Sequence, residues 1–395
     1  MVLLSINAGS SSLKVAVFDE DQLGTPRTSV SIEGIGSPSS SFIPEGHYGD
    51  AGTKAVPIAD IDAAVGLVKS WLTDELSIGA KDITALGHRI VHGGPRYTSA
   101  VIISDPVISY LQSITDLAPN HMPGTLRAIG AFRASYPEVI HVGCFDTSFF
   151  STTPKVAKTL PIAQSIQEKF SLQRYGFHGL SYQSLLSSFA AHEGEMAKNG
   201  RVIMAHLGNG ASVSASRNGQ PIDMTMGFTP VSGIMMSTRS GDLEPGVLTY
   251  LQTVGGMSVE EVEHLVAYES GLQGVSELSG NMHDLLDVQH DNPRAALAVE
   301  LFCYKVKKQI GAYAAALGGV DSIIFSGGIG ERSAEVRARI CSDLQFLGII
   351  IDEKRNHNSE RLISADGSGV GVHVIQARED VSIIKQTVQA LNQGA

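Results

Sequence analysis

Two arginines occur in local sequences that could bind an anion. Arg89 lies in "GHRIVHGGPR", beside a short apolar stretch, and Arg239 lies in "MMSTRSGD", among small polar residues and glycine. Most arginines on a protein surface are simply solvated. An arginine that lies among glycines after an apolar strand can instead bind a planar anion through two hydrogen bonds. Arg89 and Arg239 are therefore candidate anion-binding residues.

One carboxylate and one histidine are further candidates for a functional role. Asp146, in "CFDTSFF", follows a predicted buried strand, which is the usual place of a functional carboxylate in an α/β sheet. His178, in "YGFHGLSY", precedes a glycine, where the backbone can approach a ligand closely; a purely structural histidine is the alternative. His88 and His92 are four residues apart, but "HRIVHGG" is typical of a strand, which argues against a helical zinc pair.

Three glycine-containing turns could bind phosphate groups. They are "INAGSSSLK", "HLGNGAS" and "SGGIGERS". The first is not the usual P-loop, because it lacks the closing Gly-Lys-Ser/Thr and the helix behind it. The third follows a strand and opens a helix, which suits an anion or a nucleotide. Each turn alone could be an ordinary hairpin or joint, but together they predict a nucleotide whose phosphates lie between two lobes.

The elements that carry these turns suggest a duplication. "VLLSINAGSSSLKVAVFDED" and "RVIMAHLGNGASVSASRNGQPID" share one plan, an apolar strand, a turn of small residues and a second strand. The two copies are about half a chain apart. This predicts two related domains, each beginning with a hairpin whose turn faces a shared cleft. Coincidence between two glycine-rich hairpins is the alternative.

Helical patterns follow each hairpin. "DIDAAVGLVKSWLTDEL" is an amphipathic helix with Asp60 or Asp62 near its start, and "DPVISYLQSITDLA" begins with an Asp-Pro cap. "NPRAALAVELFCYKVKKQIGAYAAALGGV" predicts a long helix closed by glycines. The strand "DSIIF" follows, and then "SGGIGERSAEVRARICSDL", a glycine turn that opens a helix. The first domain is expected to end near residue 147 and the second near 380, with a last helix from about Val381 returning to the first.

Composition restricts the classes of function. The 395 residues are 43% hydrophobic and 17% charged, which suits a two-domain α/β enzyme. The net charge of −11 argues against a nucleic-acid partner. Cys144, Cys303 and Cys341 form no zinc or redox spacing and are expected to be buried thiols in a reducing compartment. Without a signal sequence or an apolar run that could span a bilayer, a cytoplasmic location is expected, with no membrane partner.

The motifs occur in an order that resembles one family. "INAGSSSLK", "GHRIVHGG", "CFDTSFF", "YGFHG", "HLGNGAS", "MGFTP", "TRSGDLEPG" and "SGGIGE" follow one another as in acetate kinases, which belong to the acetate and sugar kinase, Hsp70 and actin superfamily. The resemblance runs from about Leu3 to Val381. It implies an α/β fold of two duplicated actin-like, ribonuclease H-like domains with an interdomain cleft. The expected domains are residues 1–147 with 381–395, and residues 148–380.

The resemblance also implies residue roles. Asn7 and Glu379 match metal-site residues for magnesium or manganese, and Asp146 matches the catalytic aspartate. Residues expected near the phosphates are Ser10, Ser12 and Lys14. Residues matching the catalytic cations are Arg89, Arg239, His178 and His121, and those matching the acyl-binding set are Arg89, Val91, Asn120, Phe177 and Pro230. The nucleotide-binding segments, for ATP or ADP, are matched by His206, Leu207, Gly208, Asn209, Gly210, Asn281, Met282, His283, Gly328, Ile329, Gly330, Glu331 and Arg332.

Four segments depart from the family pattern. "APNHMP" stands where the family commonly has "APLHNP", so Asn120 replaces a leucine of the acyl pocket. Asn281-Met282-His283 replaces the usual Asp-x-Arg, and Arg332 replaces an asparagine. "GFHGLSY" replaces the usual "GFHGTSH". The departures affect both the acyl-binding and the nucleotide-binding residues. They reflect either neutral drift or an altered substrate preference.

The function implied is reversible, magnesium-dependent phosphoryl transfer from ATP to acetate by a homodimer. A carboxylate is already ionised at neutral pH, so the reaction needs alignment and neutralised repulsion more than a base. Asp146 is therefore expected to organise the metal and its waters. The alternatives are a kinase of another short carboxylate, such as propionate or a hydroxylated acid, a different phosphoryl donor, and a non-catalytic actin-like nucleotide-binding protein.

Overall fold

The computed structural model describes residues 1–9, 11–46 and 53–394, and it divides into two compact units. Unit 1 comprises Met1–Ser151 and Arg378–Ala395, and unit 2 comprises Thr152–Ala377. Ser10 lies outside the described residues. Within the described ranges, no helix combines the length and the apolar character needed to cross a membrane.

Unit 1 is built on an eight-stranded sheet in the order β5-β4-β3-β2-β1-β6-β8-β7. Its strands are β1 (Val2–Ala8), β2 (Ser12–Asp19), β3 (Thr28–Glu33), β4 (Ser41–Gly46), β5 (Lys54–Ala55), β6 (Ile83–Ile90), β7 (Val101–Ile102) and β8 (Ile140–Phe145). Its α-helices are α1 (Ile61–Ser70), α2 (Asp105–Ser113), α3 (Met122–Ser135) and α16 (Glu379–Gly394). A π-helical turn covers Trp71–Glu75, and 3-10 turns cover Ala80–Asp82, Thr115–Leu117 and Asp146–Thr152.

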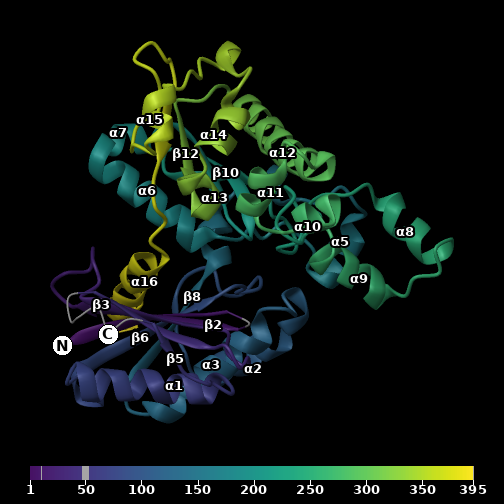
Figure 1. Cartoon of the computed structure of the whole chain (residues 1–395). Coiled ribbons are helices and arrows are strands. Elements are labelled where there is room, and N and C mark those ends of the chain that lie inside the picture. The colour runs from purple at the N-terminus through teal and green to yellow at the C-terminus, as the bar shows by residue number, and fades with distance from the viewer. Residues whose placement is uncertain (10, 47–52, 395) are drawn as a thin grey trace. The chain divides into compact units, whose positions relative to one another are not determined.

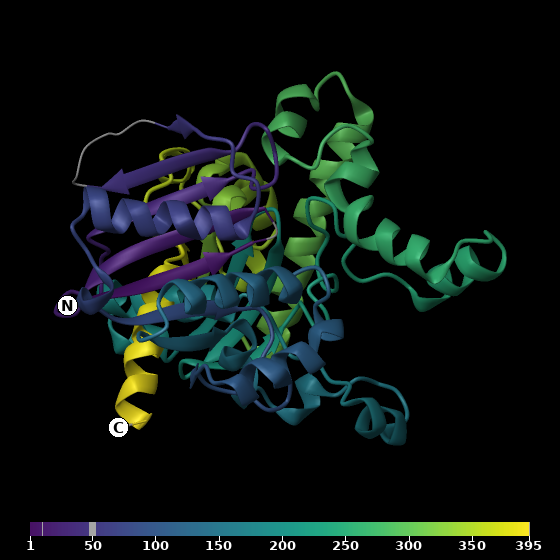
Figure 2. The same cartoon turned by 90° about the horizontal axis from the view of Figure 1, so that it is seen from below.

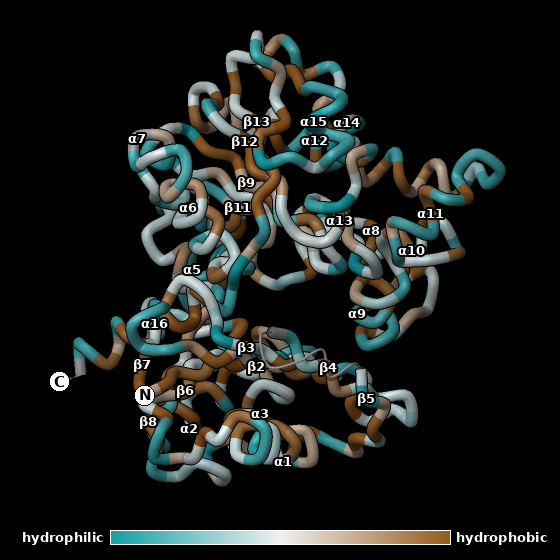
Figure 3. The backbone as a smooth tube through the Cα atoms, turned by 60° about the vertical axis from the view of Figure 1, so that its left-hand side comes forward, coloured by the Kyte–Doolittle hydropathy of each residue, from teal (hydrophilic) through white to brown (hydrophobic). Residues whose placement is uncertain are grey.

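Alternation along β1 explains why this sheet is covered on both faces. Val2, Leu4 and Ile6 face one core, which α1 and α3 complete. Leu3 faces a second, smaller core, to which α16 contributes Val381 and Ile384. Figure 1 shows α1 and α3 on one side of this sheet and α16 on the other. Figure 3 shows the central strands β6 and β8 as largely hydrophobic, as burial on two faces requires.

Unit 2 is built on a five-stranded sheet in the order β11-β10-β9-β12-β13. Its strands are β9 (Arg201–Leu207), β10 (Ala211–Arg217), β11 (Gln220–Met224), β12 (Ser322–Ser326) and β13 (Gly371–Val374). Its helices before β12 are α4 (Lys155–Lys158), α5 (Gln164–Phe170), α6 (Gly179–Glu193), α7 (Glu195–Lys198), α8 (Pro245–Thr253), α9 (Val259–Tyr268), α10 (Gly271–Ser276), α11 (Met282–Val288) and α12 (Pro293–Leu317). After β12 come α13 (Gly327–Arg332), α14 (Ala334–Cys341), a 3-10 turn (Gln345–Leu347) and α15 (Glu353–His357).

The two sheets share one topology. In unit 1, β1 pairs antiparallel with β2 and parallel with β6, which pairs parallel with β8. In unit 2, β9 pairs antiparallel with β10 and parallel with β12, which pairs parallel with β13. The third strand of each unit, β3 or β11, pairs antiparallel with the second. The duplication inferred from the two hairpins is confirmed.

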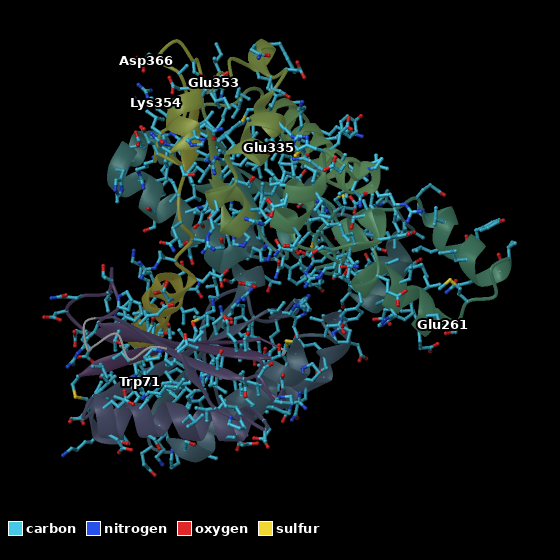
Figure 4. All side chains as sticks on the ribbon, in the orientation of Figure 1. Trp71, Glu261, Glu335, Glu353, Lys354 and Asp366 are labelled. Carbon is cyan, nitrogen blue, oxygen red and sulfur yellow. The ribbon has the colours of Figure 1, made fainter. Side chains whose placement is uncertain are left out.

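Some boundaries differ from those expected. The segment after β12 is two short helices rather than one, because Ser333 ends α13 and its hydroxyl caps α14 by accepting from the Val336 N–H. Helix α2 begins at Asp105 with Ser104 at the N-cap, so Asp105 is not the cap. Asp60 caps α1, whose apolar pattern continues into the π-helical turn at Trp71, a side chain buried within unit 1 (Figure 4).

Candidate active site

The site residues of unit 1 gather at one edge of its sheet. Strands β1, β6 and β8 are parallel neighbours, so their carboxyl ends meet at that edge. Arg89 donates from Nε and Nη2 to Oδ2 of Asp146 at 3.2 and 2.8 Å. Its Nη1 donates to Oδ1 of Asn7 at 3.2 Å and lies 3.5 Å from Oε2 of Glu379. Asn7 Nδ2 in turn donates to Glu379 Oε2 at 3.0 Å.

This arrangement, which we call the carboxylate cluster (Asn7, Arg89, Asp146 and Glu379), sets the charge of the edge. Burial by itself would lower the pKa of the Arg89 guanidinium, but the Asp146 and Glu379 carboxylates outweigh it and raise that pKa. The side chain of Asp146 is 1% exposed, so its charge depends on the guanidinium beside it. The cluster contains one guanidinium and two carboxylates. Its net negative charge would be balanced by one further positive charge.

The site residues of unit 2 centre on two imidazoles. His178 lies at the N-cap of α6 with φ of 60°, a left-handed conformation that few non-glycine residues adopt. Its Nδ1 lies 2.8 Å from Ser212 Oγ, and its ring lies 4.6 Å from the ring of His206. His206 Nδ1 lies 2.8 Å from Ser181 Oγ. We call His178, Ser181, His206 and Ser212 the imidazole cluster.

Arg239 lies beside this cluster. A Cβ placed on Gly210 would lie 3.3 Å from His178 Nε2 and 3.6 Å from Arg239 Nη1, so the guanidinium and the imidazole flank the same point. Arg239 Nη1 donates to the Pro230 carbonyl at 3.3 Å. The absence of a side chain at Gly210 keeps the backbone close to both side chains.

The turn after β12 is held from within by charged side chains. Glu331 Oε1 accepts from the Gly327 N–H at 2.9 Å and from Ser326 Oγ at 3.2 Å, so this carboxylate occupies donors at the start of the turn. Gly327 has φ of 76°, and a Cβ there would lie 2.6 Å from the Leu207 carbonyl oxygen. The turn therefore packs directly on the strand end that precedes Gly208. Fully buried Arg337 holds its other end through the carbonyls of Gly330 and Glu331.

The remaining sequence-derived residues lie in varied settings. In unit 1, Ser12 and Lys14 lie on β2, Val91 is buried just after β6, Asn120 is exposed in a turn, and His121 is the N-cap residue of α3. In unit 2, Phe177 and Pro230 are buried. Asn209 accepts from Ser237 Oγ at 3.3 Å.

The segment at 281–283 is arranged as a helix start. Asn281 accepts from the His283 N–H to cap α11, and Met282 is buried. The His283 ring is 81% exposed and lies 3.1 Å from Asp287 Oδ2. Gly280, just before it, packs on Ser237, the residue that contacts Asn209.

Sequence reasoning missed the residues that hold the site residues in place. Ser212 lies in β10, where every residue but the last is buried, and Tyr182 is fully buried on α6. A serine in an otherwise buried strand is the one signal that could have pointed to a polar partner, because buried hydroxyls require hydrogen bonds. Arg337 gave no signal at all, because "VRAR" does not distinguish a buried arginine from an exposed one.

Comparison with known proteins identifies the family. A family model described as the acetokinase family matches residues 2–385. The chain belongs to the acetokinase family. An acetate kinase of Coprothermobacter proteolyticus is 40% identical over 397 residues, 98% of each chain. A propionate kinase of Citrobacter rodentium is 38% identical over 392 residues, 98% of this chain and 96% of that one.

Solved structures of acetokinase relatives share the fold. The acetate kinase of Porphyromonas gingivalis has a TM-score of 0.88 at 35% identity, with 99% of each chain covered. A propionate kinase of Francisella tularensis has a TM-score of 0.91 at 30% identity, with 98% of each chain covered. The expected family and its fold of two duplicated actin-like domains are confirmed. Members of the acetokinase family are phosphotransferases with a carboxyl group as acceptor.

Proposed function

We propose that this chain catalyses reversible phosphoryl transfer from ATP to acetate, giving acetyl phosphate and ADP. The observation that carries the proposal is the carboxylate cluster, in which Arg89, Asp146, Asn7 and Glu379 are joined by hydrogen bonds. A protein that only bound a nucleotide would have no need for a buried carboxylate paired with an arginine beside two further polar ligands. The non-catalytic alternative is therefore disfavoured.

The reaction sets electrostatic demands that these residues meet. The attacking carboxylate and the phosphoryl group are both anionic, so the site has to neutralise their repulsion and align them. In the proposal, Arg89 orients the acyl carboxylate, and Arg239 and His178 stabilise the charge on the transferring phosphoryl group. His121 is proposed as a second imidazole near that group. Each of these side chains is a hydrogen-bond donor. Its bond to the reacting group is expected to be strongest in the transition state, where negative charge develops on the acceptor oxygens.

A divalent cation fits the carboxylate cluster. Magnesium prefers oxygen ligands and is commonly bound through one or two carboxylates with several waters. Asp146 and Glu379 supply carboxylates in one cluster, and Asn7 supplies an amide oxygen. Asn7, Asp146 and Glu379 would hold magnesium or manganese there, and the ion would supply positive charge that offsets the charge of the phosphate groups. Asp146 would then hold the metal and its waters rather than remove a proton.

We propose that the glycine turns of unit 2 bind the nucleotide. The turn at His206–Gly210 packs on the turn at Gly327–Arg332, which makes one continuous surface in unit 2. Ser12 and Lys14 are proposed phosphate-binding residues. Ser10 has the same proposed role but lies outside the described residues. Because the Glu331 carboxylate already accepts from Gly327, we assign it to holding the turn in shape.

Propionate is the second candidate acceptor, because propionate kinases are among the relatives at 38% and 30% identity. Asn120, the departure at the acyl end, is exposed. The Asn120 amide is therefore not a buried group that would favour a hydroxylated acid over acetate. Purified protein should be assayed with acetate, propionate and glycolate against ATP, GTP and pyrophosphate. Acyl phosphate formation from acetate and ATP with the highest kcat/KM supports the proposal, and failure with every pair contradicts it.

A homodimer is proposed from an apolar stripe on α8. Val247 and Tyr250 lie on α8, and Leu243 and Val254 lie just before and just after it. The four follow helical spacing and are between 42% and 66% exposed. Helix α8 has no buried residue, and α8 and α9 extend away from the rest of unit 2 (Figure 2). Such a stripe is typical of a surface covered by a second copy. Light scattering should give twice the chain mass, and Tyr250→Glu should give a monomer.

A further inference from the structure

A buried tyrosine is linked to His178 through one serine hydroxyl. Ser212 Oγ lies 2.8 Å from His178 Nδ1 and 2.5 Å from the Tyr182 hydroxyl oxygen. Tyr182 is 0% exposed and Ser212 is 1% exposed. The three groups form a hydrogen-bonded chain that begins inside unit 2 and ends on the imidazole.

The chemistry of the three groups sets the direction of this chain. A phenol is a stronger acid than an aliphatic alcohol, so Tyr182 is the better donor and Ser212 the better acceptor between them. Ser212 then has its own proton to donate to the imidazole nitrogen. Burial raises the pKa of the Tyr182 hydroxyl, although hydrogen bonds with Ser212 and the main chain of His206 lower it. The phenol therefore keeps its proton at neutral pH.

We propose that Tyr182 is a positioning residue, whose hydroxyl acts through Ser212 to keep Nδ1 of His178 unprotonated and Nε2 protonated. The inference rests on the proposed role of His178 in phosphoryl transfer. A neutral imidazole carries one proton, and its two nitrogens differ only in which of them holds it. With Nδ1 accepting from Ser212, the single N–H lies on Nε2, the nitrogen that faces Gly210 beside Arg239.

The surroundings of His178 make this tautomer consequential. The charged or titratable groups that face its ring include the Arg239 guanidinium and the His206 imidazole, with the Tyr182 phenol behind Ser212. The contact of Nδ1 with Ser212 Oγ, at 2.8 Å, orients the ring. The Nε2–H and Arg239 would then both donate toward one anionic group. An imidazole with its proton on Nδ1 would instead present a lone pair to that anion.

Tyr182→Phe and Ser212→Ala test the inference. Protein labelled with ¹⁵N at histidine reports the tautomer, and the signal of His178 is the one lost in His178→Gln. We expect the wild type to show the Nε2–H tautomer. In Tyr182→Phe, Ser212 loses its donor and becomes able to accept from Nδ1–H. We therefore expect a mixture of tautomers, roughly tenfold lower kcat with the KM for acetate nearly unchanged, and an acidic limb of the kcat profile at higher pH.

The controls separate positioning from general damage. Tyr136→Phe also removes a buried hydroxyl, which belongs to unit 1 and has no hydrogen-bond partner among the described residues. It should leave the His178 signal and the pH profile unchanged. Ser212→Ala should alter the tautomer as Tyr182→Phe does, and the double variant should add nothing further. An Nδ1–H tautomer in the wild type, or an unchanged tautomer and pH profile in both variants, overturns the inference. If the wild type phosphorylates no carboxylate, the proposed function fails, while the tautomer is still decided by the spectra.

Discussion

Arg89 donates two hydrogen bonds, at 2.8 and 3.2 Å, to a single carboxylate oxygen of Asp146. Both side chains belong to unit 1, one from the end of β6 and the other just after β8. The contact fixes the guanidinium plane while its Nη1 reaches Asn7 and Glu379. An arginine held in this way is positioned before any substrate arrives.

Arg89→Ala should lower kcat strongly. Loss of a charge-assisted contact that forms in the transition state costs on the order of 3–4 kcal/mol, roughly 100- to 1,000-fold in rate. The KM for ATP should change little, because the proposed nucleotide contacts lie elsewhere. Steady-state kinetics measures both constants. Arg133→Ala serves as control, because Arg133 belongs to the same unit and its side chain is 36% exposed. Near-wild-type turnover in Arg89→Ala would show that the residue does not bind the reacting anions.

A buried histidine pair should make unit 1 sensitive to acid. His141 donates from Nε2 to the Tyr136 carbonyl at 3.2 Å, so its Nδ1 accepts from His88 Nε2 at 2.9 Å. Burial lowers the pKa of both histidines, helped at His88 by the charge of His141 and opposed at His141 by the Tyr136 carbonyl. The unfolded chain therefore binds more protons below about pH 6.5, and the free energy of unfolding falls as pH falls, by up to about 1.4 kcal/mol per pH unit for each histidine.

The fluorescence of Trp71, the one tryptophan, reports urea unfolding of that unit. Between pH 6.5 and 5, the free energy of unfolding should fall less steeply in His88→Gln than in the wild type, because one of the two histidines with a lowered pKa is removed. His290→Gln, at an exposed position, should leave the slope as in the wild type. Equal slopes in His88→Gln and the wild type would mean that the pair does not carry the acid sensitivity.

Arg337→Met should destabilise unit 2 and weaken nucleotide binding. All five N–H groups of this fully buried guanidinium donate to neutral oxygens, of Gly330, Glu331, Asn356 and Ser359. Burial lowers its pKa to about 10, so it stays charged at neutral pH. Its loss leaves several buried carbonyls unpaired, at a cost of about 3–5 kcal/mol.

Arg339→Met is the matched control for Arg337→Met, because Arg339 lies on the same helix with its side chain 36% exposed. It should change stability by less than about 1 kcal/mol. Calorimetry with and without ADP measures both effects. If Arg337→Met melts like Arg339→Met and binds ADP equally well, the turn at 327–332 does not depend on this buried cation.

Asn120→Leu should leave the preference for acetate intact. The asparagine is exposed, so its amide can be hydrated and need not meet the substrate methyl group. We expect the ratio of kcat/KM for acetate over glycolate to change by less than about threefold, since no buried hydrogen bond is lost. A tenfold or larger rise of that ratio in Asn120→Leu would instead mean that Asn120 bonds a hydroxylated acid.

The sequence predicts the sheets better than it predicts the site. Both hairpins follow from alternation of apolar residues, as at Val2, Leu4 and Ile6, and the repeated plan predicts the repeated topology. The proximity of Arg89 and Asp146 could not be read from their separation of 57 residues, because it depends on β6 and β8 being parallel neighbours. Helix α14 illustrates the limit most plainly, since Arg337 is fully buried and Arg339 partly exposed although only Ala338 separates them.

The most direct test of the proposed function is ³¹P NMR of the purified chain with acetate, ATP and magnesium. We expect the acetyl phosphate and ADP signals to grow together in the wild type, and to grow roughly 100- to 1,000-fold more slowly in Arg239→Ala, because this arginine is proposed to stabilise the phosphoryl group in the transition state. Absence of acetyl phosphate in the wild type would contradict the proposed function, and equal rates in the two proteins would contradict the role proposed for Arg239.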